Sequence, residues 1–226
     1  MSFVIAAKCA PDAGILSNIQ KAGIKAVEIF LSKQLLTKRS VLIDVCKDYD
    51  FRYAVHAPND DFSPDALAEF VYGTNAEAVT FHDIFWEDEW LMIIERLKNL
   101  QVKLCVENLG SVHDSAKFMR RFGFGRCLDV EHLQIEVAGV NEAEFVNAMR
   151  EATHIHLTGY SFGTRNWHTH IYQNYEHGIY MLDLIKKSGY NGLVVSEAGC
   201  SFQTFADFQK LSRFYEEWLI KNGGCD

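Results

Sequence analysis

The stretch Lys103-Leu104-Cys105-Val106-Glu107 is a short apolar run that ends in a carboxylate, and its pattern recurs along the whole chain. Short runs of this kind, bounded by polar or glycine-containing segments, are typical of buried strands. They occupy Phe3–Ala7, Ala26–Phe30, Arg52–His56, Ala78–His82, Lys103–Glu107, Arg126–Asp129, His154–Leu157 and Leu193–Glu197. We therefore predict eight strands.

Helical patterns separate the predicted strands. Apolar residues recur at helical spacing in residues 90–97 and 205–211, for example. Regular alternation of strand and helix indicates a parallel sheet, and eight such units within 226 residues favour a closed barrel over an open sheet. No glycine-rich phosphate loop follows the first strand to suggest a doubly wound fold. The predicted fold is a compact α/β chain, a single (β/α)₈ TIM barrel domain that spans residues 1–226.

Composition limits the setting in which the protein acts. The N-terminal segment is too quickly interrupted by charge to be a signal peptide, and no apolar run approaches the length of a membrane span, so we expect a cytoplasmic protein with no membrane partner. The net charge of −8 offers no broad basic surface, which disfavours nucleic acid, although a local basic or metal-rich cleft stays compatible with it. Composition does not indicate an oligomeric state.

The cysteines form no Cys-x-x-Cys pair. We interpret them as reduced thiols, because their spacing does not suit a zinc site and a chain of this size needs no disulfide framework. The six are Cys9, Cys46, Cys105, Cys127, Cys200 and Cys225.

Seven of the eight predicted strands end, or nearly end, in a side chain that can bind a metal or a proton. In a barrel the carboxyl ends of the strands meet at one mouth, so these groups would form a ring. Burying carboxylates and imidazoles together is costly unless a cation neutralises them, so the ring predicts a divalent metal site. Its ligand types suit zinc, manganese or iron. The seven residues are Glu28, His56, His82, Glu107, Asp129, His156 and Glu197.

Further histidines lie on or after the sixth and seventh strands. His132 follows the sixth strand in Asp129-Val130-Glu131-His132, and His168 and His170 lie in the loop after the seventh. His154 and His156 alternate along one strand and therefore point the same way. His156 is nearer the mouth and is the better ligand, so we assign His154 to the layer beneath it.

This constellation resembles the xylose isomerase-like superfamily, which contains sugar and sugar-phosphate isomerases and epimerases together with the endonuclease IV branch of apurinic/apyrimidinic endonucleases and their AP endonuclease 2 relatives. The resemblance extends over the whole barrel. Its common element is one metal held by Glu, Asp, His and Glu from the fifth to the eighth strands. The matching positions here are Glu107, Asp129, His156 and Glu197.

The ligand set is most similar to the endonuclease IV branch. The segments that carry this similarity are Val55-His56-Ala57-Pro58, Phe81-His82, Asp129-Val130-Glu131-His132, and Phe162-Gly163-Thr164-Arg165 followed by His168-Thr169-His170. The resemblance implies one to three ions. Glu107 would bridge two of them, His56 and His82 would complete one site, Asp129, His156 and Glu197 the second, and His132, His168 and His170 the third. Because His168 replaces an Asp of the branch and the chain is short, a standard duplex-DNA repair enzyme is not expected.

Two enzymatic functions suit such a site. The main prediction is metal-assisted hydrolysis of a phosphate ester, with Arg165 gripping a phosphate oxygen. The alternative is isomerisation or epimerisation of a small sugar or sugar phosphate, with Glu107 and Glu197 exchanging protons with carbon. Lys33 and Glu28 are further candidates for substrate contacts. A barrel that only binds a ligand is a third possibility, disfavoured because the ring of ligands is complete.

Overall fold

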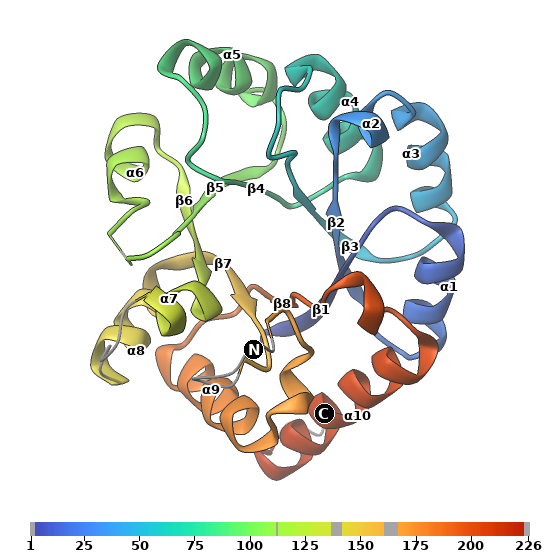
Figure 1. Cartoon of the computed structure of the whole chain (residues 1–226), viewed down its shortest axis with the longest axis vertical. Coiled ribbons are helices and arrows are strands. Elements are labelled where there is room, and N and C mark those ends of the chain that lie inside the picture. Colours follow the sequence, from blue (N-terminus) through green and yellow to red (C-terminus); the bar gives the residue numbers. More distant parts are fainter. Residues whose placement is uncertain (1–2, 112, 137–141, 161–166, 224–226) are drawn as a thin grey trace.

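The computed structural model describes residues 3–111, 113–136, 142–160 and 167–223, and it forms a closed barrel of parallel strands (Figure 1). Each strand pairs with the next along the chain, and β8 closes the ring against β1. The predicted eight-stranded α/β barrel is therefore confirmed. The strands are β1 (Val4–Cys9), β2 (Ala26–Phe30), β3 (Arg52–His56), β4 (Ala78–Phe81), β5 (Lys103–Glu107), β6 (Gly125–Asp129), β7 (Ala152–Leu157) and β8 (Leu193–Ser196).

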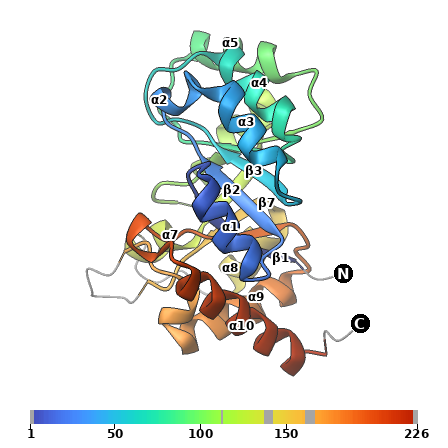
Figure 2. The same ribbon diagram turned by 90° about the vertical axis from the view of Figure 1, so that its right-hand side faces the viewer.

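Helices surround the ring of strands on the outside (Figure 1). They are α1 (Ala13–Lys21), α2 (Lys33–Leu36), α3 (Arg39–Lys47), α4 (Pro64–Thr74), α5 (Glu87–Leu97), α6 (Ala116–Phe122), α7 (Val130–Glu136), α8 (Glu142–Glu151), α9 (Tyr175–Ser188) and α10 (Phe205–Lys221), with short 3₁₀ turns η1 (Ile171–Gln173) and η2 (Cys200–Phe202). Seen from the side, α1 and α10 lie across the outside of the barrel (Figure 2). Within the described residues, no helix has the length and apolar character needed to cross a bilayer.

Local sequence signals explain where several helices begin. The side chain of Asp12 accepts a hydrogen bond from the amide of Ile15 at the start of α1. Ser63 caps α4 in the same way, and Pro64 stands at the first helical position, where its missing N–H costs nothing. At the other end of the chain, Thr204 starts α10 with a reciprocal capping arrangement.

The barrel interior is built in layers, because alternate residues of a strand point to the same side. At the bottom lies an apolar cluster that consists mainly of small residues: Ala6, Ala26, Ala54, Ala78, Leu193 and Val195. Two positions further along β1, β2 and β3 come Lys8, Glu28 and His56, all buried. The bottom of the barrel is therefore filled by apolar side chains, and the polar layer begins directly above it.

The strand boundaries differ slightly from the prediction. β1 runs two residues beyond the predicted end at Ala7, so Lys8 belongs to the strand and faces the interior. β4 ends at Phe81 and leaves His82 as the first residue after it. The cysteines at 9, 46, 105, 127 and 200 are free thiols, as predicted, while Cys225 lies outside the described residues.

Candidate metal centre

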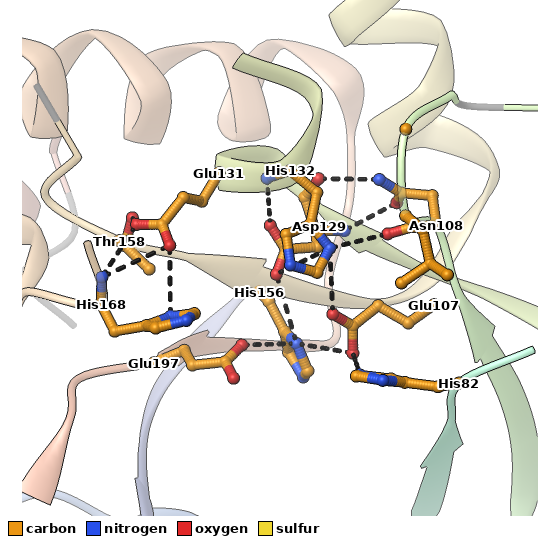
Figure 3. A network of polar contacts seen from close by, with 12 residues as sticks. His82, Glu107, Asn108, Asp129, Glu131, His132, His156, Thr158, His168 and Glu197 are labelled. Carbon is orange, nitrogen blue, oxygen red and sulfur yellow. Dashed lines mark hydrogen bonds and ion pairs between the residues drawn. The ribbon is translucent and has the colours of Figure 1, made fainter. Parts of the chain in front are cut away.

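Four side chains converge at the carboxyl ends of β5 to β8, and we call them the central cluster: Glu107, Asp129, His156 and Glu197. His156 lies in the middle (Figure 3). Its Nδ1 is 2.8 Å from Glu197 Oε2, 3.3 Å from Glu107 Oε2 and 3.9 Å from Asp129 Oδ2. The carboxylates of Glu107 and Glu197 flank the imidazole on opposite sides (Figure 3).

The central cluster fits a divalent cation, judged by its unsatisfied atoms. Asp129 Oδ2, His156 Nδ1 and Glu197 Oε2 are buried, and within the described part of the chain none of them has a hydrogen-bond partner. Such buried orphans are rare in proteins, and these three face one another. Two carboxylate oxygens and one imidazole nitrogen are ligand types that zinc, manganese and iron accept.

The pKa shifts of the carboxylates in the central cluster also favour a bound cation. Burial, together with the neighbouring carboxylates of Glu107 and Glu197, raises the pKa of Asp129 well above its ordinary value. Burial also opposes ionisation of Glu107, but the charge of the neighbouring His156 holds the pKa of Glu107 well below the ordinary value. A bound cation would relieve the repulsion among these crowded carboxylates.

Asn108 fixes the ends of β5 and β6 relative to each other. Its side-chain amide donates to the backbone carbonyl of Asp129 at 3.0 Å, and its side-chain oxygen accepts from the Asp129 amide at 2.8 Å. The carbonyl of Asn108 in turn accepts a hydrogen bond from His132 Nδ1 at 2.9 Å. These contacts hold Asp129 and His132 in place, with part of the His132 ring exposed at the rim.

A second group adjoins the central cluster through Glu107. His56 Nε2 lies 3.2 Å and His82 Nε2 lies 3.4 Å from Glu107 Oε2. His56 donates from Nδ1 to the Ala57 carbonyl at 3.0 Å, which leaves a lone pair on Nε2 of the neutral ring facing the carboxylate. Two acceptors that face each other are stabilised by a cation between them, so this group is a candidate for a second ion.

Glu28 lies beneath the central cluster and is fully buried. Its Oε2 accepts from His154 Nε2 at 2.7 Å and from His156 Nε2 at 3.1 Å. His156 therefore uses one ring nitrogen to bind Glu28 and turns the other toward the cluster, an arrangement in which a carboxylate orients a metal-binding imidazole. Within the described residues, the side chain of Glu28 contacts Lys8, His154 and His156.

Lys8 is a charged residue of the site that the sequence reasoning missed. Its Nζ lies 2.5 Å from Glu197 Oε1 and 3.4 Å from Glu28 Oε1, and its side chain is only 9% exposed. Burial opposes the charge, but Glu197 and Glu28 raise the pKa of Lys8 above its ordinary value. The missed signal is the alternation of Ala6 and Lys8, which places both residues on the interior face of β1.

The three histidines proposed for a third ion are not brought together. His170 Nδ1 lies 2.9 Å from Ser196 Oγ and its Nε2 lies 2.9 Å from the Phe202 carbonyl, so both ring nitrogens are occupied by structural partners. His168 contacts Glu131, while His132 contacts the central cluster. The four groups of candidate ligands found in the described residues contain none of these three histidines.

Of the two remaining candidates for substrate contacts, the structure describes only Lys33, which has no contact with the central cluster among the described residues. Lys33 starts α2, is exposed, and forms an ion pair with Asp61 at 2.8 Å. Arg165 lies outside the described residues.

The sequence matches no family model and no curated protein. Solved structures do share its fold. They include a D-allulose 3-epimerase from Methylomonas sp., with a TM-score of 0.63 and 14% identity over 97% of this chain and 100% of that one. The same epimerase in complex with D-allulose has a TM-score of 0.61 and 12% identity, over 97% of each chain. A phosphoribosyl anthranilate isomerase from Thermotoga maritima has a TM-score of 0.58 and 12% identity, over 96% of this chain and 100% of that one. Identities this low show the fold alone.

Proposed function

We propose that the protein is a divalent-metal-dependent enzyme that isomerises or epimerises a small sugar or sugar phosphate. The observation that carries this proposal is the central cluster, in which four ligands from consecutive strands converge and leave three buried atoms unsatisfied. The separation of His132, His168 and His170 counts against a three-ion site. The D-allulose 3-epimerase, whose structure is similar to this one, was solved in complex with D-allulose, which supports a small carbohydrate as the substrate.

Glu107, Asp129, His156 and Glu197 would hold the ion. A bound divalent ion supplies Lewis acidity, which polarises a substrate carbonyl and its adjacent hydroxyl.

The two glutamates supply the proton transfers. Burial opposes ionisation of Glu197, but Lys8 and His156 lower its pKa, and the pKa of Glu107 is lowered as well, so both are carboxylates at neutral pH and can accept a proton. Glu197 is 16% exposed whereas Glu107 is 1% exposed, so Glu197 is the more accessible base. The two flank His156 from opposite sides (Figure 3), so a substrate carbon between them would lose its proton to one carboxylate and regain one on its other face from the second glutamate, once that group has taken a proton from solvent, which inverts the carbon.

Hydrolysis of a phosphate ester, the main prediction from the sequence, stays a second candidate. The observation that favours it is the group formed by His56, His82 and Glu107. Glu107 belongs to this group and to the central cluster, as a ligand shared by two ions would.

The test combines metal content with solvent exchange. Protein purified without chelator is analysed for metal per chain and then incubated in D₂O with D-allulose, D-fructose and their 6-phosphates, while NMR follows loss of carbon-bound hydrogen. Deuterium uptake that Glu197→Gln abolishes, with about one ion per chain, would support the isomerase or epimerase. Two ions per chain and phosphate release from p-nitrophenyl phosphate, without uptake, would support the hydrolase instead.

A further inference from the structure

A buried carboxylate outside the central cluster has no role in the chemistry described so far. Glu131 in α7 is fully buried, and its contacts are with Thr158 and His168 (Figure 3). Thr158 donates a short hydrogen bond to Oε2, and the backbone amide of His168 donates to the same oxygen at 3.1 Å. His168 Nδ1 lies 3.2 Å from Oε1. A buried charge is costly unless it is paired, and the imidazole is the partner that could carry positive charge.

His168 is held in an unusual position by these contacts. Its φ of 48° lies in the left-handed region, which is uncommon for a residue other than glycine and is often retained where function requires it. Its carbonyl accepts a hydrogen bond from the Gly199 amide at 2.8 Å. The backbone is therefore fixed on both sides of the side chain.

The ring of His168 has a buried edge and an exposed edge. Nδ1 is buried against Glu131, whereas the side chain as a whole is 45% exposed. The exposure therefore lies on the rest of the side chain, and among the described residues Nε2 has no hydrogen-bond partner. The Nδ1 contact is an ion-pair contact rather than an aligned hydrogen bond, a looseness common in sites without substrate.

The pair lies at the mouth of the barrel, beside the central cluster. Glu131 follows Asp129 by two residues, and His168 lies in the loop after β7. The backbone carbonyl of His168 accepts from the amide of Gly199, two residues after Glu197, and Figure 3 draws His168 and Glu197 on the side of His156 away from His82. A sugar whose reacting carbon lies by Glu197 would thus have an oxygen within reach of this imidazole.

We propose that Glu131 and His168 form an acid–base pair in which His168 exchanges a proton with a substrate oxygen and Glu131 positions the ring. A buried carboxylate at Nδ1 with a free Nε2 is the arrangement by which enzymes fix the tautomer of a catalytic histidine. The inference rests on the isomerase or epimerase function proposed above. It gives His168 a role different from the metal ligand that the resemblance implies.

The proton transfers of this step balance. A carboxylate of the cluster takes the proton from the substrate carbon, and the electron pair of that C–H bond becomes the C=C bond of an enediol. The electrons of the carbonyl π bond move to its oxygen, which takes the Nε2 proton from protonated His168 and leaves the ring neutral. Glu131 stays ionised and keeps the Nδ1–H. In the second half, the other glutamate, protonated from solvent, delivers a proton to the opposite face of the same carbon, the C=C pair forms the new C–H bond, and the enediol oxygen returns its proton to Nε2 as the carbonyl re-forms, which gives the epimer.

The experiment compares His168→Gln and Glu131→Gln with the matched control His113→Gln, since His113 is an exposed histidine that belongs to none of the candidate ligand groups of the described residues. The probe is whichever of the four sugars named above exchanges with the wild type. We expect His168→Gln to lower kcat about 100-fold or more, with KM and metal content near the wild-type values and His113→Gln unaffected. Glu131→Gln should lower kcat at least about tenfold, because an amide at this position no longer selects the tautomer protonated at Nδ1.

Nitrogen-15 NMR of labelled histidine provides a readout independent of turnover. The His168 ring should carry its proton on Nδ1 in the wild type and lose this preference in Glu131→Gln. Wild-type kcat in His168→Gln would overturn the acid–base pair while leaving the proposed function intact. Loss of a bound ion in His168→Gln would also overturn it, because His168 would then be a ligand. If the wild type exchanges no sugar, the proposed function fails and the proton step with it, and the tautomer shows separately whether the pairing exists.

Discussion

Replacing Lys8 by Met should destabilise the protein more when metal is removed than when metal is bound. Lys8 is the ammonium that faces both Glu197, at 2.5 Å, and Glu28, at 3.4 Å. Methionine keeps the length of the side chain but leaves two buried carboxylates without this cation. Removing one partner of a buried ion pair costs about 3–5 kcal/mol.

The expected loss lies at the lower end of that range. Glu28 keeps its hydrogen bonds from His154 and His156, and Glu197 keeps its contact with His156 at 2.8 Å. We therefore expect a decrease of about 3 kcal/mol in the free energy of unfolding, which corresponds to about 6–12 °C in Tm for a chain of this length. A bound divalent ion would neutralise Glu197, so the decrease should be smaller with metal present.

The assay is reversible urea unfolding followed by circular dichroism, in EDTA and with saturating manganese. Lys33→Met is the matched control, because Lys33 has an ion pair of similar length, 2.8 Å, but is exposed. The urea midpoint of Lys33→Met should stay at the wild-type value, since exposed ion pairs contribute little to the free energy of unfolding. A Lys8→Met protein as stable as the wild type in EDTA would contradict this expectation, because it would mean that the cost of desolvating Lys8 offsets its attraction to both carboxylates.

Three other substitutions probe the second layer and the loops of the barrel. Glu28→Gln should weaken metal binding about 10- to 100-fold, because Glu28 orients His156, and competition with a chelating dye measures this; unchanged affinity would contradict that role. Burial lowers the pKa of His170, so the unfolded state takes up its proton more readily, and stability should fall as pH drops below the ordinary value of about 6.5. In His170→Gln, the free energy of unfolding measured in urea should depend less on pH between pH 5 and 7. An unchanged pH dependence would show that His170 does not cause the loss of stability. Gly159→Ala should cost about 1–3 kcal/mol, since the new Cβ would lie 2.3 Å from the backbone carbonyl oxygen of His170, and a wild-type urea midpoint would show that the backbone yields.

Much of the fold is visible in the sequence, because strands buried on both faces appear as short apolar runs. All eight predicted strands exist, and the runs at 26–30, 52–56 and 103–107 have the predicted boundaries. The errors occur at the ends, where a polar residue can either close a strand or continue it into the barrel. Lys8 was missed for this reason, because a lysine after an apolar run is usually exposed to water.

The local pattern of the sequence is enough to predict which side chains stand at the carboxyl ends of the strands, since period-two alternation and parallel closure follow from it. These two regularities suffice to place Glu107, Asp129, His156 and Glu197 at one mouth. How far each group reaches and which way each imidazole faces depend on the three-dimensional arrangement of the chain. In the folded chain, Glu28 lies beneath His156 and accepts a hydrogen bond from it, and His168 contacts Glu131 rather than the central cluster. His170 is enclosed between Ser196 and Phe202. The physical reason is that strand geometry repeats with the sequence, whereas ring orientation and loop conformation depend on hydrogen-bond partners far apart in the chain.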